Sequence, residues 1–181
     1  VVSDLPALSA AARAANPAAL SIVDNTYTTP LLVRPLALGV DVVLHSMTKY
    51  INGHGDVLAG VIASNNKQYV AAALHTVIDF GTTLSPWDAW LAMRGLRTLG
   101  VRMKSIGSNA LQVARFLSSN SRVPRVYYPG LPSHPQYEVV RRLAASVRAP
   151  SEQDALTGFA FSGMISFDLN IDVNVRGEDE G

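Results

Sequence analysis

Short apolar runs that end in polar residues recur along the first half of the chain. They lie at residues 20–26, 41–46 and 56–64, and a short helical segment closed by Gly39 separates the first two. Runs of this length predict buried strands. Because helical segments separate them, the pattern favours an α/β domain with a mostly parallel sheet. Ligands of such sheets bind beyond the carboxyl ends of the strands.

Helical patterns flank these strands. A first helix is expected after an N-cap at Ser3 or Asp4 and is expected to stop at Asn16 and Pro17. Residues 66–80 predict a second helix, which follows the third strand. Helices in these positions would cover the faces of the sheet.

From Ser85 onward, the alternation of short strands and helices gives way to a long helical pattern. Ser85 as N-cap, with Asp88 three residues later, predicts the start of a helix. The helical pattern then continues for too long to be one ordinary helix, and Gly95, Gly100 and Gly107 are the expected kinks or breaks. We expect a domain boundary near Gly107, which divides the chain into residues 1–107 and 108–181.

The second part, residues 108–181, predicts a small α+β unit. Its expected elements are helices at residues 110–118 and 137–147 and strands at residues 125–130 and 163–171. A polar loop, residues 148–158, precedes the last strand. The unit stops before it can close a sheet, and the chain begins without methionine, so we expect a fragment or a chain that has lost both ends.

Composition narrows the class of protein. Hydrophobic residues make up 48% of the 181 residues and the formal net charge is +1, so we expect no nucleic-acid partner. No apolar run reaches the roughly 20 residues that span a bilayer, and the signal-peptide layout is absent. We therefore expect a cytoplasmic protein with no membrane partner. The chain has no cysteine, which excludes disulfides and thiolate sites, and no HxxxH or HExxH motif supports a metal site.

Lys49 follows the second predicted strand, at the edge of the sheet where ligands bind. An apolar setting favours the neutral form of an amine, which attacks carbonyl groups, so a Schiff base is the covalent chemistry to consider first. Ser46 and Thr48 precede Lys49 at alternate positions, and both hydroxyls can bind a phosphate. The same residues also fit a strand end capped by hydroxyls, with the lysine as a solvated surface charge.

Asp24 ends the first predicted strand, in the same edge zone as Lys49. A carboxylate beside a lysine ordinarily forms a salt bridge. If a pyridine ring lay between them, the carboxylate could keep the ring nitrogen protonated while the lysine held the aldehyde carbon. That arrangement would make the ring an electron sink.

The stretch VDNTYTTPLLVRPLALGVDVVLHSMTKYINGHGDV, residues 23–57, resembles the Cys/Met-metabolism family of pyridoxal-phosphate enzymes. SPWDAWLAMRGLRTLGVRM, VYYPGLPSHPQY and GMISFDL resemble later parts of the same family in the same order. The resemblance implies the aspartate aminotransferase fold, fold type I of the PLP-dependent transferases. Residues 1–107 would be part of the PLP-binding large domain, and residues 108–181 an incomplete C-terminal small domain.

The resemblance also implies roles for the site residues. Lys49 would carry pyridoxal 5'-phosphate as an internal aldimine, Asp24 would pair with the pyridine nitrogen, and Ser46 and Thr48 would bind the phosphate. The substrate would be a sulfur amino acid. Family members are usually homotetramers, dimers of dimers in which two subunits contribute to each active site.

Within this family, the sequence most resembles a carbon–sulfur lyase. Gly55, in TKYINGHGDVLAG, is common in methionine γ-lyase, which converts methionine to a 2-oxo acid, ammonia and a thiol. We therefore expect γ-elimination from methionine or a related amino acid. Cystathionine γ-synthase and cystathionine γ-lyase are the alternatives.

The chain also departs from the family pattern. The family's phosphate-binding glycine loop, its ring-stacking tyrosine and the Tyr and Arg from the neighbouring subunit would lie upstream of this chain, and the arginine that binds the substrate carboxylate would lie downstream. The loop at residues 148–158 is longer than expected. An alternative of another class is therefore a non-catalytic fragment or pseudoenzyme with a role in assembly. A nucleotide-binding domain would need a Walker or GxGxxG motif, which the chain lacks.

Overall fold

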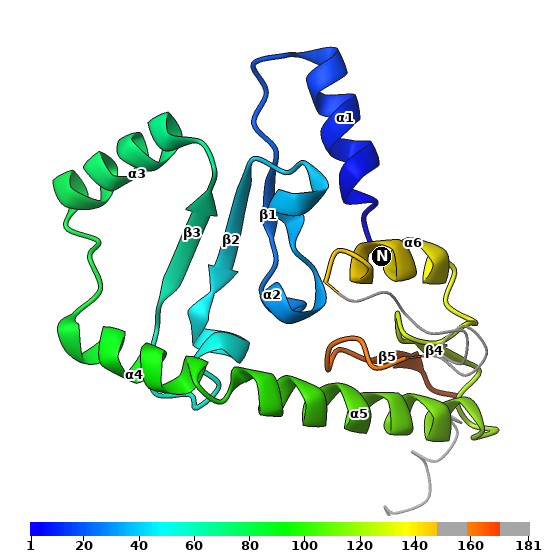
Figure 1. Cartoon of the computed structure of the whole chain (residues 1–181). Coiled ribbons are helices and arrows are strands. Elements are labelled where there is room, and N and C mark those ends of the chain that lie inside the picture. The colour runs from blue at the N-terminus through cyan, green and yellow to red at the C-terminus, as the bar shows by residue number, and fades with distance from the viewer. Residues whose placement is uncertain (148–158, 171–181) are drawn as a thin grey trace, which may run out of the picture.

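The structure is a computed structural model that describes residues 1–147 and 159–170. Figure 1 shows the arrangement of its elements. In chain order they are α1 (Leu5–Ala15), β1 (Ile22–Asp24), α2 (Thr29–Leu32), the 3-10 helix η1 (Pro35–Leu38), β2 (Val42–Ser46), the π-helical turn η2 (Met47–Ile51), β3 (Gly60–Ser64), α3 (Lys67–Phe80), α4 (Pro86–Leu96), α5 (Leu99–Ser118), β4 (Arg125–Tyr127), α6 (Tyr137–Ala144) and β5 (Ser166–Asp168).

The first sheet contains three strands in the order β1-β2-β3. β1 and β2 are parallel, with Asp24 opposite Leu44, whereas β2 and β3 are antiparallel, with Ser46 opposite Gly60. The predicted mostly parallel sheet is therefore mixed in the described part of the chain. Parallel strands need a long crossover, usually a helix over the face of the sheet. The chain between Ser46 and Gly60 instead turns back through η2, so β3 runs in the opposite direction.

Local capping residues set the ends of several helices, and the sequence predicts those at Asp4, Gly39 and Ser85. The side chains of Asp4, Asn66 and Ser85 accept backbone N–H groups at the starts of α1, α3 and α4. Gly39 and Gly81 end η1 and α3 in the left-handed conformation, with φ of 88° and 65°. These boundaries follow from the nearby sequence alone.

α5 is one continuous helix of 20 residues that runs through Gly100 and Gly107, so a helix break at either of these two glycines is wrong. The expected break at Gly95 is close to the observed interruption, because α4 ends at Leu96. The interruption comes earlier, between α4 and α5, which run beneath both sheets in the view of Figure 1. Gly107 is buried, and a Cβ there would lie 3.1 Å from the side chain of Ala160. The glycine therefore permits close packing. The division into residues 1–107 and 108–181 stays a prediction.

β4 and β5 form a separate antiparallel pair, in which Arg125 lies opposite Asp168. Both strands are shorter than predicted, and α6 ends at Ala144 where the sequence predicted a helix to residue 147. The predicted loop at residues 148–158 lies outside the described residues, as does the last residue of the predicted strand at 163–171.

Three small hydrophobic clusters connect elements that are distant in sequence. They contain Val33, Val140, Leu143, Ala144 and Phe161; Ala110, Ala114, Tyr128 and Leu131; and Ile51, Leu99 and Met103. The first attaches α6 to the loop after α2. The third packs the turn that follows β2 against the start of α5, so α5 supports this turn from below the sheet.

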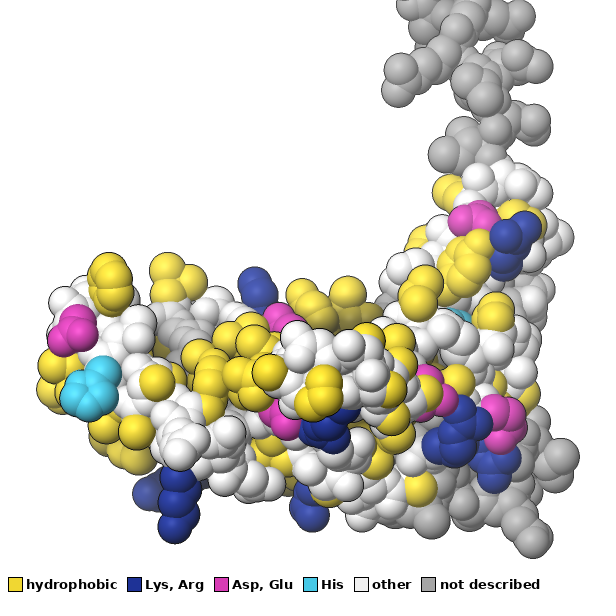
Figure 2. Space-filling view, turned by 90° about the horizontal axis from the view of Figure 1, so that it is seen from above, with side chains coloured by type: hydrophobic (Ala, Val, Ile, Leu, Met, Phe, Trp, Pro, Cys, Tyr) yellow, Lys and Arg dark blue, Asp and Glu magenta, His cyan; other side chains and the backbone are white. Residues whose placement is uncertain are grey.

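Large apolar side chains also lie on the surface. β3 is exposed along most of its length, Ile62 is 50% exposed, and Phe80 and Trp87 are 78% and 67% exposed. Figure 2 shows hydrophobic side chains spread over the face that it displays. Within residues 1–147 and 159–170, no helix combines the length and the apolar character needed to cross a membrane.

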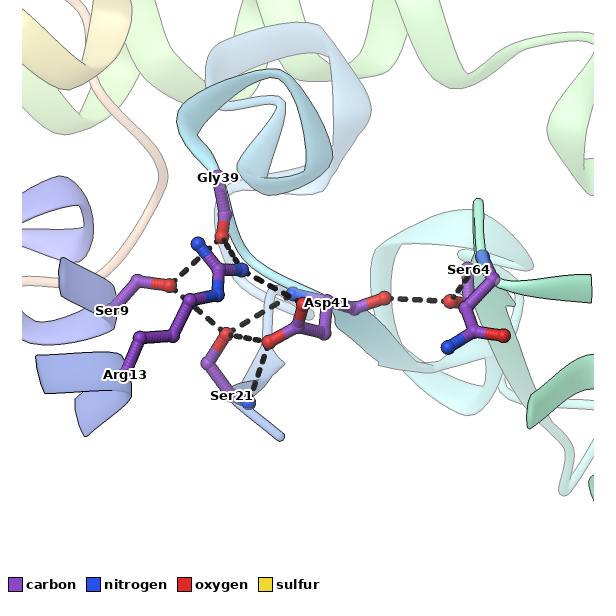
Figure 3. A network of polar contacts seen from close by, with 7 residues as sticks. Ser9, Arg13, Ser21, Gly39, Asp41 and Ser64 are labelled. Atoms are coloured by element: carbon purple, nitrogen blue, oxygen red, sulfur yellow. Dashed lines mark hydrogen bonds and ion pairs between the residues drawn. The ribbon is translucent and has the colours of Figure 1, made fainter. Parts of the chain in front are cut away.

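A polar network attaches α1 to the amino end of β2 (Figure 3). Asp41 accepts hydrogen bonds from the Ser21 hydroxyl at 2.7 Å and the Ser21 backbone N–H at 2.9 Å, and it pairs with Arg13 at 2.7 Å. The bonds from Ser21, and then those from Arg13, lower the pKa of Asp41 from 3.8 to about 2. Arg13 and Ser9 also donate to the Gly39 carbonyl.

Replacing Asp41 with asparagine is expected to reduce the free energy of unfolding at neutral pH by about 1–2 kcal/mol. The folded-state pKa of Asp41, about 2, lies below the ordinary value of 3.8. The carboxylate therefore contributes its full stability above about pH 4, and this contribution is lost as the pH falls through about 2. Urea unfolding at about pH 7 and about pH 2 measures the effect.

Asp79→Asn is the matched control, because Asp79 is exposed on α3 and its side chain makes no hydrogen bond or ion pair with a described residue. It should leave the stability unchanged at both pH values. An Asp41→Asn effect of the same size at both pH values would contradict the assignment of the pKa shift to the folded network.

Candidate active site

The carboxyl ends of β1 and β2 lie side by side, and the candidate site forms there. β1 ends at Asp24 and β2 ends at Ser46. Thr26 connects the two ends: its hydroxyl donates to Asp24 Oδ1 at 2.5 Å and accepts the Ser46 backbone N–H at 2.7 Å. The Thr26 N–H also donates to Asp24 Oδ1, at 2.9 Å. Thr26 therefore fixes the Asp24 carboxylate relative to the end of β2.

The loop that follows Asp24 is held by buried polar side chains. The Asn25 amide donates to the Val33 carbonyl at 3.0 Å, and its backbone N–H donates to the Leu44 carbonyl at 2.9 Å. Thr29 is fully buried and has a φ of 56°, which is unusual for a β-branched residue. The loop thus leaves the sheet directly after β1, while Asp24 itself stays exposed.

Lys49 lies in η2, the single turn after β2. Its backbone, with φ of −88° and ψ of −118°, departs from helical values, and its carbonyl accepts the Gly53 N–H at 2.7 Å. The Lys49 side chain is exposed and has no hydrogen bond or ion pair with a described residue. The apolar setting expected from the sequence is therefore not provided by the described residues, but the amine is free to react.

Ser46 and Thr48 differ in how free their hydroxyls are. β2 ends at Ser46, as the sequence predicts, and Thr48 belongs to the turn that follows. Thr48 Oγ1 accepts the Ala59 N–H at 3.1 Å and donates to the Ala59 carbonyl at 3.4 Å. The Ser46 hydroxyl bonds to no described residue. Ser46 is thus the freer anion ligand, and Thr48 can accept one further hydrogen bond.

His45 is a buried histidine beside this site. Its side chain is 7% exposed, and Nδ1 has no hydrogen-bond partner. Desolvation lowers the pKa of His45, against smaller opposing effects of the Asp24 charge and the Asn25 backbone. The neutral imidazole therefore dominates at neutral pH, and it adds no positive charge next to Asp24.

His54 lies apart from His45 and bonds to the Asn52 carbonyl at 2.6 Å through Nδ1. Across the ranges that the structure describes, no three His, Cys, Asp or Glu side chains are grouped so that they could hold a metal ion.

Thr26 is a candidate site residue to which sequence reasoning assigned no role. A hydroxyl two residues after an aspartate is typical of a local turn closed by the aspartate side chain, and that spacing was the available signal. The second partner of Thr26, the Ser46 backbone, is 20 residues away in sequence. That contact follows only from the pairing of β1 with β2.

Comparison with known proteins identifies the family. The family described as Cys/Met metabolism PLP-dependent enzyme matches residues 1–175. The chain is 42% identical over 168 residues to cystathionine beta-lyase of Lactococcus lactis subsp. cremoris, in an alignment that covers 93% of this chain and 40% of that protein. It is 48% identical over 140 residues to L-methionine gamma-lyase of Treponema denticola, which covers 77% of this chain and 35% of that protein.

The fold agrees with these similarities. Cystathionine gamma synthase from Xanthomonas oryzae pv. oryzae, solved in complex with cystathionine, superposes with a TM-score of 0.82 at 36% sequence identity. The superposition covers 95% of this chain and 40% of that chain. The chain thus spans about 40% of the length of these relatives. The α/β fold predicted from the sequence, fold type I of the PLP-dependent enzymes, is confirmed as a partial fold. Since the family match extends over nearly all of its residues, the chain belongs to the Cys/Met-metabolism family of PLP-dependent enzymes.

Proposed function

We propose that this protein is a PLP-dependent carbon–sulfur lyase that acts on a sulfur amino acid. One observation carries the proposal. Lys49 presents an amine without a described partner, directly after the strand end that Thr26 ties to the Asp24 carboxylate. The family match supplies the class of chemistry, and the residues of the site supply the groups that this chemistry needs.

The described residues fit pyridoxal phosphate in three respects. The cofactor has an aldehyde, a pyridine nitrogen and a phosphate, which require an amine, a carboxylate and hydrogen-bond donors. The Lys49 amine is exposed, and Asp24 uses only Oδ1 in its bonds to Thr26, which leaves Oδ2 available. The Ser46 hydroxyl is free to donate to a phosphate oxygen.

Each of these residues then has a role in the reaction. When bound, pyridoxal phosphate supplies an electron sink that stabilises a carbanion at the substrate α-carbon. Lys49 would hold the cofactor and, once released, would accept the α-proton and return a proton to the product. Asp24 would keep the pyridine nitrogen protonated, and Thr26 would keep Asp24 oriented. Ser46 would donate its hydroxyl to the phosphate, and Thr48 would do so by turning its hydroxyl away from the Ala59 carbonyl, to which it donates at 3.4 Å.

For the substrate, we propose γ-elimination from methionine or a related amino acid, with a 2-oxo acid, ammonia and a thiol as products. The similarity to the Treponema denticola L-methionine gamma-lyase supports this reaction. The similarity to the Lactococcus lactis cystathionine beta-lyase and to the Xanthomonas oryzae cystathionine gamma synthase favours cystathionine as a second candidate substrate or product. A non-catalytic fragment with an assembly role would not need Asp24, Ser46, Thr48 and Lys49 together.

We further propose that the protein assembles as a homotetramer, a dimer of dimers with shared active sites. Exposed large apolar side chains support an interface, because apolar surface is stabilised when association removes it from water. Ile62, Phe80 and Trp87 are examples, at 50%, 78% and 67% exposure. The cytoplasmic location stays a prediction from the sequence.

Trapping the cofactor tests the central proposal. Incubation with pyridoxal phosphate and reduction with borohydride should leave a phosphopyridoxyl group on Lys49, which peptide mass mapping would locate. Lys49→Ala should abolish this adduct. Lys67→Ala should not, because Lys67 is an exposed residue at the start of α3. A folded wild-type protein without the adduct would refute the proposal.

Thiol release separates the candidate reactions. We expect more thiol from methionine than from cystathionine, and no cystathionine formation from cysteine plus an activated homoserine. The reverse order between methionine and cystathionine would favour a cystathionine lyase, and net synthesis would favour the synthase. An intact Lys49 adduct without turnover of any of these substrates would favour the non-catalytic alternative.

Replacing Thr26 with valine should lower the free energy of unfolding by about 1–3 kcal/mol, because the Ser46 N–H loses its acceptor in a partly buried site. The same change should weaken binding of pyridoxal phosphate, because Asp24 loses the hydroxyl that orients it. Thr26→Ser keeps the hydroxyl and is the control. Urea unfolding and a cofactor titration measure the two effects, and equal cofactor binding by the valine and serine variants would contradict the orienting role.

A further inference from the structure

Arg102 reaches from the first turn of α5 to the turn that carries Lys49. Its Nη1 donates to the Tyr50 carbonyl at 2.7 Å, and its Nη2 donates to the Ile51 carbonyl at 3.2 Å. These two residues directly follow Lys49 in the sequence. The guanidinium therefore bonds to the backbone immediately beyond the reactive lysine.

The same guanidinium also bonds to the end of α4. Nη2 donates to the Gly95 carbonyl at 2.9 Å, and Nε donates to the Thr98 hydroxyl at 2.9 Å. Carbonyls at the end of a helix have no partner within the helix. The planar guanidinium carries five N–H donors in a fixed geometry, so it can bond to carbonyls of two chain segments at once. Arg102 thus joins the α4–α5 junction to the Lys49 turn.

Two glycines allow these segments to approach each other. Gly53 has a φ of 74°, and a Cβ at this position would overlap the Arg102 guanidinium. A Cβ at Gly95 would overlap the backbone of Asn52. The contact is also desolvated, which lowers the pKa of Arg102 below its ordinary value. An arginine nevertheless remains charged in a protein.

The contacts of Arg102 exclude a direct role with the substrate. Four of its N–H donors are directed to the Tyr50, Ile51 and Gly95 carbonyls and the Thr98 hydroxyl. A guanidinium engaged in this way cannot also form the two parallel bonds that hold a carboxylate.

We propose that Arg102 is the positioning residue for Lys49: by bonding to the Tyr50 and Ile51 carbonyls, it fixes the backbone from which the lysine side chain projects. This inference rests on the proposed function, since it concerns the reactive amine of the same site. Lys49 has a non-helical backbone within a helical turn, so the turn needs an external contact to select one conformation. Arg102 supplies that contact from a separate helix.

Arg94 provides a matched comparison, because it contacts the same loop in a different way. Its Nη2 lies 3.3 Å from Asp56 Oδ2, and the two side chains are 51% and 37% exposed. An exposed ion pair of this kind contributes little. Arg97 is exposed between α4 and α5, and its side chain makes no hydrogen bond or ion pair with a described residue, which makes it a second control.

The test compares Arg102→Gln, Arg94→Gln and Arg97→Gln in the full-length protein with two measurements. The first is amide hydrogen exchange in a peptide that covers residues 47–56, with α3 as the internal reference. The second is the rate at which the Lys49 phosphopyridoxyl adduct forms. For Arg102→Gln we expect exchange in residues 47–56 to rise about 10- to 100-fold, the effect of losing hydrogen bonds to a charged donor, with α3 unchanged. Adduct formation should slow by about tenfold or more.

The controls should behave like the wild type in both measurements. Unchanged exchange in residues 47–56 of Arg102→Gln would overturn the inference, as would faster exchange with wild-type adduct formation. Faster exchange in α3 as well would show a general structural role and would also overturn it. If the wild-type protein itself formed no adduct, the proposed function would fail and the inference with it, which distinguishes that result from a failure of Arg102 alone.

Discussion

The chain reverses direction immediately after Ser46, the last residue of β2. The backbone N–H and C=O groups of this turn lie outside the strand ladder, and the site depends on which other groups form hydrogen bonds with them. Residues 47–51 lie beyond the end of the strand ladder, and one helical turn cannot bond all of its own carbonyls. An unpaired buried carbonyl is costly, so the partners come from elsewhere. Thr48 bonds to Ala59 on the returning chain, and Arg102 bonds to the carbonyls that follow Lys49. The turn is therefore fixed by hydrogen bonds to the returning chain and to α5, while the Lys49 side chain stays exposed.

At the end of β1, the backbone groups beyond the strand ladder also need hydrogen-bond partners, and here a side chain of the following loop provides them. β1 stops at Asp24, and Thr26 uses one hydroxyl both to donate to the carboxylate and to accept the Ser46 N–H. His45 is buried and feels the charge of Asp24, and because desolvation lowers its pKa it stays neutral beside this carboxylate. No protein cation among the described residues pairs with this carboxylate. Its negative charge is thus available to a cationic ligand group, such as a protonated ring nitrogen.

Local features of the fold could be predicted from the sequence because their causes are local. The caps at Asp4, Asn66 and Ser85 act within three residues. The sequence predicts Ser85 as a cap and offers Asp4 beside Ser3, and it places the start of α3 within one residue. The apolar runs placed Asp24 and Ser46 at strand ends, since strand period and length are also local properties.

The features that sequence reasoning missed are set by distant contacts. A glycine such as Gly107 predicts a helix break, but Gly107 lies in the middle of α5, where it packs against Ala160. Nothing near Gly107 in the sequence indicates that contact. The direction of β3 depends on the turn at residues 47–51 and on the absence of a crossover helix. Thr26 and Arg102 act on backbone groups 20 and about 50 residues away. Their residue types alone therefore did not distinguish them from other polar side chains.

The later part of the chain also contributes to the shape of the site. Tyr128 is fully buried, and desolvation raises its pKa to about 12, so its hydroxyl remains a donor. That hydroxyl donates to the Ser162 carbonyl at 3.2 Å and accepts the Phe161 N–H at 2.7 Å. Ser162 in turn donates to the Tyr27 carbonyl at 2.6 Å, in the loop that follows Asp24. A shift of this segment relative to the first sheet would therefore act on the Asp24 loop, so the second part of the chain helps to set the geometry of the site.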